Sequence, residues 1–173
     1  LGASLPAAAG HDYCFVVDGG KNLKIMRNWF EPSEPNPEVG PTPGPASYPY
    51  WLWLRSTSNG TGNQVCSDCE ISYNRFNNKA NTGSFIVTEG DSGTALQACQ
   101  RIWIHHNYLS NIENESVNGS PNGTGNKEAI RLASSSLSLS SGFCIIENNL
   151  FENCDGEDEI ISIKCCDNII RWN

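Results

Sequence analysis

The strongest pattern along the chain is a short run of alternating apolar and polar residues that ends in an asparagine. Alternation with a period of two predicts strands with one buried face. An apolar residue stands two places after the asparagine wherever the chain continues. A second apolar run lies between successive copies, at 51–55, 85–89, 129–133 and 160–164. The pattern occurs five times, and its asparagines are Asn28, Asn74, Asn107, Asn149 and Asn173.

The spacing of these asparagines indicates a solenoid. Successive copies are 46, 33, 42 and 24 residues apart. Two interleaved sets of strands with turn residues between them are typical of repeat architectures. The shortest spacing matches one bare coil of a right-handed parallel β-helix, and the longer ones a coil with loop insertions. Each coil would stack on the next at the strand spacing of about 4.8 Å.

Asparagine suits the corner of such a coil. It tolerates left-handed backbone, and its amide can hydrogen-bond to the same residue in the next copy. An ordinary β-sandwich is the alternative, but it does not require the phrase to recur five times. No stretch shows a sustained 3.6-residue apolar period, so we expect little helix.

We therefore predict an all-β chain, with residues 1–173 forming one parallel β-helix domain of about five coils. Long loop insertions are expected at about 31–50 and 111–127, and loops at a coil edge are where such a scaffold carries function. A solenoid with uncapped ends exposes unpaired strands. We therefore expect either further chain or end-to-end self-association.

Charge and composition narrow the function. The chain has 11 Lys and Arg against 19 Asp and Glu, a net charge of −8, which argues against a general nucleic-acid binder. A hydrophobic content of 38% is too high for a disordered acidic tail. No apolar run is long enough to span a membrane. The first residue is Leu1 and no signal segment is visible, so we expect a processed chain or a fragment.

Cysteines and glycosylation motifs favour a secreted protein. The chain has eight cysteines, an even number that is compatible with disulfides. The pair Cys66 and Cys69 is more typical of a disulfide or of packed thiols than of a zinc site. Cys144 and Cys154 flank one expected corner of a coil and can form a disulfide. Four Asn-x-Ser/Thr motifs lie in polar stretches that can carry an oligosaccharide; they are Asn59, Asn114, Asn118 and Asn122.

The segment with the most chemistry is 153–164, where three acidic residues follow Gly156 and precede an apolar strand that ends in Lys164. Carboxylates this close repel one another unless a cation lies among them. Oxygen-rich clusters of this kind suit hard cations such as Ca²⁺. A solvated acidic turn with a surface lysine is the alternative.

Strand alternation constrains where these groups point. It places Ile161 and Ile163 inward and Ser162 and Lys164 outward. Glu157 and Glu159 then share the outer face only if a bend lies between Gly156 and Ile160. The preceding coil contributes Glu128 and Arg131, with Arg131 outward and stacked near Ser162 or Lys164. A basic residue beside an acidic cluster indicates an anionic ligand held partly through a metal.

Four stretches carry a family resemblance: 149–164 with 168–171 after it, 126–135, 51–55 and 73–76. They resemble polysaccharide lyase family six, the chondroitinase B and alginate lyase family, and the similarity runs from about Lys21 to Asn173. The Glu157-x-Glu159 pair followed by Lys164 is its most specific part.

The resemblance implies a right-handed parallel β-helix that cleaves uronate-containing polysaccharide by β-elimination. In the family, Ca²⁺ held by one Asn and two Glu neutralises the uronate carboxylate. Carried over, Glu157 and Glu159 are calcium ligands and Lys164 is the base. A lysine is a base only in its uncharged form, which a neighbouring cation favours.

Two departures from the family pattern are visible. The family's Asn ligand lies in an Asn-Gly-Gly-Glu phrase, whereas this chain has Gly125-Asn126-Lys127-Glu128. Asn126, the candidate third ligand, is therefore one place off. The family's arginine that protonates the leaving oxygen would lie beyond Asn173.

The remaining candidates are for substrate binding. Arg131 is expected to bind a substrate carboxylate. Arg55, which lies beside the outward Trp53, and His106 are the further candidates for substrate binding. Alternation sends His105 and His106 to opposite faces, with one of them packed.

We therefore expect a secreted, glycosylated lyase that acts on alginate or on dermatan or chondroitin sulfate with calcium. The alternative is a non-catalytic extracellular glycoprotein that keeps the β-helix, either as a filament subunit or as a glycan-binding module.

Overall fold

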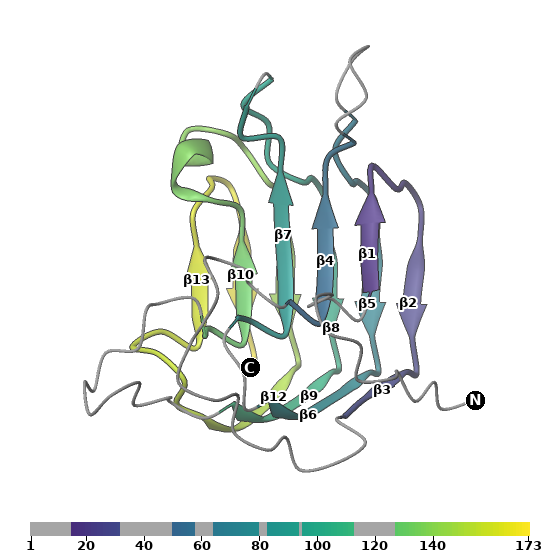
Figure 1. Ribbon diagram of the computed structural model, residues 1–173, viewed down its shortest axis with the longest axis vertical. Coiled ribbons are helices and arrows are strands. Elements are labelled where there is room, and N and C mark those ends of the chain that lie inside the picture. The colour runs from purple at the N-terminus through teal and green to yellow at the C-terminus, as the bar shows by residue number, and fades with distance from the viewer. Residues whose placement is uncertain (1–14, 32–49, 58–63, 80–82, 94, 113–126) are drawn as a thin grey trace, which may run out of the picture.

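The computed structural model describes residues 15–31, 50–57, 64–79, 83–93, 95–112 and 127–173. Over these ranges the chain winds through three parallel sheets, which confirms the predicted β-helix (Figure 1). The first sheet has the order β1 (Phe15–Asp18), β4 (Leu52–Arg55), β7 (Ile86–Gly90), β10 (Ile130–Leu132) and β13 (Ile161–Ile163).

The second sheet lies behind the first in Figure 1 and the third runs along the bottom. The second contains β2 (Lys24–Met26), β5 (Glu70–Ser72), β8 (Trp103–His105), β11 (Ile145–Glu147) and β14 (Ile169–Arg171). The third contains β3 (Trp29–Phe30), β6 (Arg75–Lys79), β9 (Tyr108–Ile112) and β12 (Leu150–Cys154). Each complete coil therefore has three strands, not the two that the sequence predicted. The apolar residue after each repeat asparagine belongs to this third strand.

Identical positions of successive coils stack in register and form the core. In the second sheet one inward position is isoleucine in every coil, and Ile71, Ile104 and Ile146 are fully buried. In the third sheet the rings of Phe30 and Phe76 stack with centroids 4.5 Å apart. Each fully buried side chain of this size contributes about 1.5–3 kcal/mol by leaving water.

The predicted asparagine column forms at the corner between the second and third sheets. Asn74 Nδ2 donates to Asn107 Oδ1 at 3.0 Å, and Asn107 Nδ2 donates to Asn149 Oδ1 at 3.0 Å. The same contact is made at both ends, so the asparagine column consists of Asn28, Asn74, Asn107, Asn149 and Asn173.

The sequence predicted that the asparagine itself adopts the left-handed conformation at this corner. In the structure the residue before the asparagine adopts it. Tyr73 has φ 55°, His106 φ 52° and Asn148 φ 53°. The turn is made one residue earlier, and this leaves each asparagine side chain directed along the stack.

Helix is scarce, as expected: the described residues include the short 3₁₀ helix η2 (Ser135–Leu137). None of their helices is long and apolar enough to cross a membrane. Most of the two predicted insertions, 31–50 and 111–127, lies outside the described residues.

Candidate active site

The strands of the first sheet are entered through a break in the inward-outward alternation. Phe85 and Ile86 are consecutive, fully buried and part of one core, and so are Ala129 and Ile130. Two inward residues in a row require a bend at the strand entry. The residues just before that bend, such as Glu128, therefore point to the outer side, which is the geometry that the sequence required for Glu157 and Glu159.

Three carboxylates converge at this bend. Ile130 pairs with Ile161, so Glu128 and Glu159 occupy matching positions two residues earlier on neighbouring coils. Carboxylate oxygens of Glu128, Glu157 and Glu159 all lie within 4.8 Å of one another. We call these three residues the acidic cluster.

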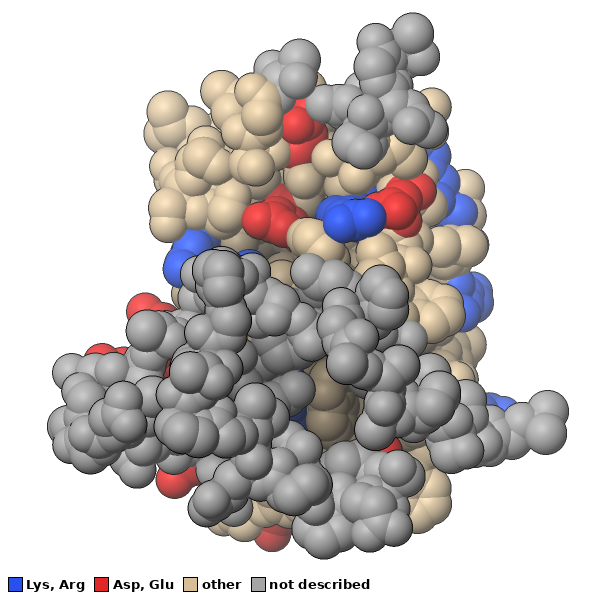
Figure 2. All heavy atoms as spheres, in the orientation of Figure 1, with Lys and Arg blue, Asp and Glu red and all other residues tan. Residues whose placement is uncertain are grey.

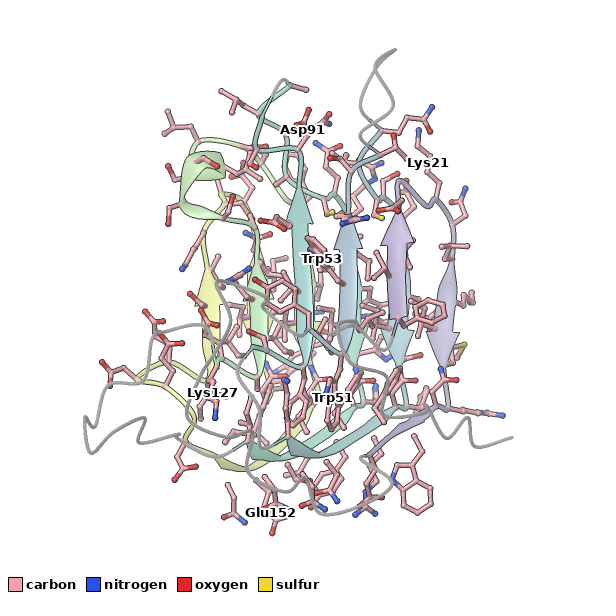
Figure 3. All side chains as sticks on the ribbon, in the orientation of Figure 1. Lys21, Trp51, Trp53, Asp91, Lys127 and Glu152 are labelled. Atoms are coloured by element: carbon pink, nitrogen blue, oxygen red, sulfur yellow. The ribbon has the colours of Figure 1, made fainter. Side chains whose placement is uncertain are left out.

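A glycine allows Glu157 to reach the cluster. A Cβ on Gly156 would lie 2.8 Å from the carbonyl oxygen of Lys127, so only glycine permits this approach of the two coils. The backbone N–H of Lys127 then donates to Glu157 Oε2 at 2.8 Å. Lys127 is labelled in Figure 3 at the lower end of the sheet, where β10 and β13 begin.

Glu128 is the buried member of the cluster, with 1% of its surface exposed. Within the described residues its hydrogen-bond partner is a neutral hydroxyl, Ser84, which donates to Glu128 Oε2 at 3.0 Å. A buried carboxylate is costly unless a cation compensates its charge. Three carboxylates with one of them buried are a donor set that fits a hard cation such as Ca²⁺.

Basic groups lie beside the cluster on the outer face of the first sheet. Arg131 pairs with Ser162, one of the two neighbours that the sequence predicted. Lys164 follows β13, is half-buried, and its N–H donates to Leu132 O at 2.8 Å. The same parity as Ser162 places Lys164 on the outer face, so the acidic cluster and the amine lie at the two ends of one strand.

Arg131 is held more firmly than expected for a substrate ligand. It is 6% exposed, its Nη2 donates to Tyr50 Oη at 2.6 Å, and its Cζ lies 4.9 Å from the Tyr50 ring centroid. Tyr50 thus fixes the guanidinium against the sheet.

Arg55 lies on the same face, three strands away from β13. Its Cζ is 4.4 Å from the Trp53 ring centroid, and it is paired with Asp18. Trp53 Nε1 donates to Glu89 Oε2 at 3.0 Å. Figure 3 places Trp53 on the near face of this sheet, and Figure 2 shows acidic and basic side chains side by side across it.

The structure does not bring His106 to the acidic cluster. It lies at the corner that follows β8 in the second sheet. His105 is buried and His106 is exposed, so one of the two is packed, as predicted. The two rings nevertheless contact each other rather than facing opposite ways, and His106 has a left-handed φ of 52°. Their Nδ1 atoms are 2.8 Å apart, and His105 Nε2 lies 3.1 Å from Glu70 Oε1.

Several predicted residues lie outside the described part of the chain. These are the candidate calcium ligand Asn126 and the glycosylation motifs at Asn59, Asn114, Asn118 and Asn122.

The seven described cysteines are free thiols. The bridge between Cys144 and Cys154 that the sequence left open is not formed, because the two lie at different corners. Cys144 precedes β11 of the second sheet, whereas Cys154 ends β12 of the third. Cys165 packs on the core and Cys166 is exposed.

The carboxylates of the second sheet have a different environment. Glu70 Oε2 lies 2.9 Å from Lys24 Nζ, and this hydrogen bond lowers the pKa of Glu70. Glu147 Oε2 lies 2.6 Å from Arg171 Nε, which lowers the pKa of Glu147. A basic side chain on a neighbouring coil compensates the charge of each of these two carboxylates, so this sheet is not the candidate cation site.

Sequence reasoning noted Glu128 but did not assign it to the cluster, and it missed Ser84 and Tyr50. One signal was available for Glu128: it stands two residues before Ile130, as Glu159 stands two before Ile161.

Comparison with known proteins adds one match. The sequence model of a family described as Chondroitinase B matches residues 54–173, which include Glu128, Glu157, Glu159 and Lys164. No curated protein matches the chain significantly, and no solved structure does.

Proposed function

The chain belongs to the chondroitinase B family, of polysaccharide lyase type, and on that premise we propose that it cleaves a uronate-containing polysaccharide by calcium-assisted β-elimination. Alginate is the first substrate to test, followed by dermatan and chondroitin sulfate. The observation that carries the proposal is the convergence of Glu128, Glu157 and Glu159 at the start of the strand that Lys164 follows.

Glu128, Glu157 and Glu159 would hold the cation. Bound there, Ca²⁺ supplies positive charge that neutralises the uronate carboxylate and the negative charge that develops on it. Glu128 takes a place in the donor set beside the Asn126 that the resemblance implied. Ser84 fixes Glu128 by its hydrogen bond.

Lys164 is the proposed base. Its uncharged amine takes the C5 proton of the uronate, the C5–H electron pair forms the C4–C5 double bond, and the C4–O4 bond breaks. A proton delivered to O4 completes the cleavage. Arg131, held by Tyr50, and Arg55, stacked on Trp53, are the proposed positive groups along the polysaccharide. Secretion and glycosylation remain part of this proposal.

The test uses the native-length protein and follows the ultraviolet absorbance of the unsaturated product. We expect activity that a chelator removes and calcium restores. Lys164→Ala should lower kcat roughly 10²–10⁴-fold, the contribution of a general base. Lys21→Ala is the matched control, because Lys21 lies on an exposed turn of the first coil.

Full activity of Lys164→Ala would overturn the role of the lysine. Binding of uronate polysaccharide without any cleavage would instead favour the non-catalytic glycan-binding protein.

A further inference from the structure

Six cysteines gather at one corner of the solenoid, between the first and second sheets. Each lies between a strand of the first sheet and the next strand of the second. They are Cys66, Cys69, Cys99, Cys144, Cys165 and Cys166. The proposed lyase chemistry uses none of them.

Cys66 and Cys99 are neighbours on adjacent coils. Ser67 pairs in parallel with Gln100, and Gln100 N donates to Cys66 O at 3.0 Å. Asp68 (φ 57°) and Arg101 (φ 52°) follow two residues after each cysteine, so both coils turn in the same way. Register at the strand spacing puts the two Cα atoms about 4.8 Å apart, inside the range of about 4.4–6.8 Å for disulfides.

Both thiols point into the same core. Cys66 is fully buried and Cys99 is 1% exposed, and both belong to the main hydrophobic cluster. We propose that Cys66 and Cys99, which are free thiols in the structure, form a disulfide on oxidation that ties the coil of β4–β6 to the coil of β7–β9.

The ionisation of the pair favours this bond. A hydrogen bond from the Cys99 thiol lowers the pKa of Cys66 to about 7, and the same hydrogen bond raises the pKa of Cys99. Where the two coils are stacked, Cys66 is therefore the more easily ionised of the two thiols, and the thiolate is the nucleophile.

Oxidised glutathione is the oxidant in this scheme. During folding, the Cys66 thiolate attacks one of its sulfurs and releases one reduced glutathione. The Cys99 thiolate then attacks the Cys66 sulfur of the mixed disulfide and releases the second. Two protein thiols lose two electrons and two protons, and one glutathione disulfide becomes two thiols.

Cys69 is the competing partner, because it lies three residues from Cys66 in the same coil. Its thiol donates to Ser67 O at 3.2 Å and to Gly20 O at 3.6 Å, whereas the thiol that hydrogen-bonds to Cys66 is that of Cys99.

The experiment refolds the native-length protein in a buffer of oxidised and reduced glutathione. Free thiols are then alkylated, and the digest is mapped by mass spectrometry. We expect a linked pair of peptides containing Cys66 and Cys99 that disappears on reduction. Cys69→Ser should keep the link, and Cys99→Ser should leave Cys66 alkylated. Closing the loop between Cys66 and Cys99, which are 33 positions apart, should raise the unfolding midpoint by roughly 10 °C relative to the reduced protein.

Alkylation of both cysteines in the oxidised, folded protein would overturn the proposal, and so would a link between Cys66 and Cys69. If Cys99→Ser fails to fold, the oxidised and reduced wild-type proteins still give the peptide map and the midpoint shift.

Discussion

The asparagine column and the acidic cluster are both built by stacking polar side chains on neighbouring coils, but they treat those groups in opposite ways. In the column each amide donates to one neighbour and accepts from the other, as Asn107 does with Asn149 and Asn74. In the cluster the stacked groups are all anionic, and Glu128 has a neutral hydroxyl as its described partner. The column is complete within the chain, whereas the cluster calls for a cation from outside.

This difference separates stability from function. An amide is both donor and acceptor, so a ladder of identical residues satisfies itself at any length. A carboxylate is only an acceptor, so a ladder of carboxylates is stable only with a cation or a proton. The residues that maintain the solenoid are therefore repeated in every coil, and those of the candidate site occur at one bend.

The largest expected effect comes from breaking the column at its centre. Asn107→Ala removes the acceptor of Asn74 N and Nδ2 and the donor to Ile71 O, all buried. Buried groups left unsatisfied cost about 1–3 kcal/mol each, so we expect a loss of about 3–5 kcal/mol in the free energy of unfolding, measured by urea denaturation. Asn28→Ala at the exposed end should cost about 1 kcal/mol. Equal losses would show that burial does not set what each asparagine of the column contributes.

The next effect tests the need for an external cation. Calcium at 100 times its Kd should stabilise the protein by about 2.7 kcal/mol, seen as a rise in the unfolding midpoint in calorimetry. Glu128→Gln removes one charge from the cluster at nearly constant shape and should abolish most of the rise. Glu152→Gln, on the third sheet (Figure 3), is the matched control. An unchanged calcium response in Glu128→Gln would show that the buried carboxylate is not a ligand.

A third prediction concerns the turn that delivers Glu157. Gly156→Ala would place a Cβ 2.8 Å from Lys127 O and 2.9 Å from Lys127 Cβ, so the turn has to move. We expect a loss of roughly 1–3 kcal/mol in stability and a weaker calcium response, measured by thermal unfolding with and without calcium. Gly93→Ala, whose Cβ would lie 3.6 Å from Asp91 Oδ1, should leave both unchanged. A normal calcium response in Gly156→Ala would contradict the role of this close approach.

The same contrast explains what the sequence could predict. The asparagines of the column were predicted correctly because every coil repeats the same residue at the same corner, and a repeat is visible in a single sequence. The third strand was missed because each such strand begins directly after the asparagine, so that in the sequence its residues continue the preceding strand. Glu128 stands two residues before Ile130, as Glu159 stands two before Ile161, but its assignment to the cluster was missed because only the paired register of β10 and β13 shows that the two side chains meet.

The smallest effect is expected from an acid whose charge a neighbouring coil compensates. Hydrogen bonds from Arg101 lower the pKa of Asp68 from 3.8 to about 2. A carboxyl group whose pKa is lowered by folding stabilises the folded protein at pH values above its ordinary pKa. That contribution disappears as the pH falls through about 2. Arg101→Gln should return the pKa of Asp68 toward 3.8, measured by NMR titration of its carboxyl carbon.

The stability difference between the two proteins should be small, because the pair is exposed, and should vanish at the lowest pH. A pKa of Asp68 that stays near 2 in Arg101→Gln would mean that the turn, rather than the neighbouring coil, compensates this charge. The proposed distinction between compensated and uncompensated carboxylates would then need another basis.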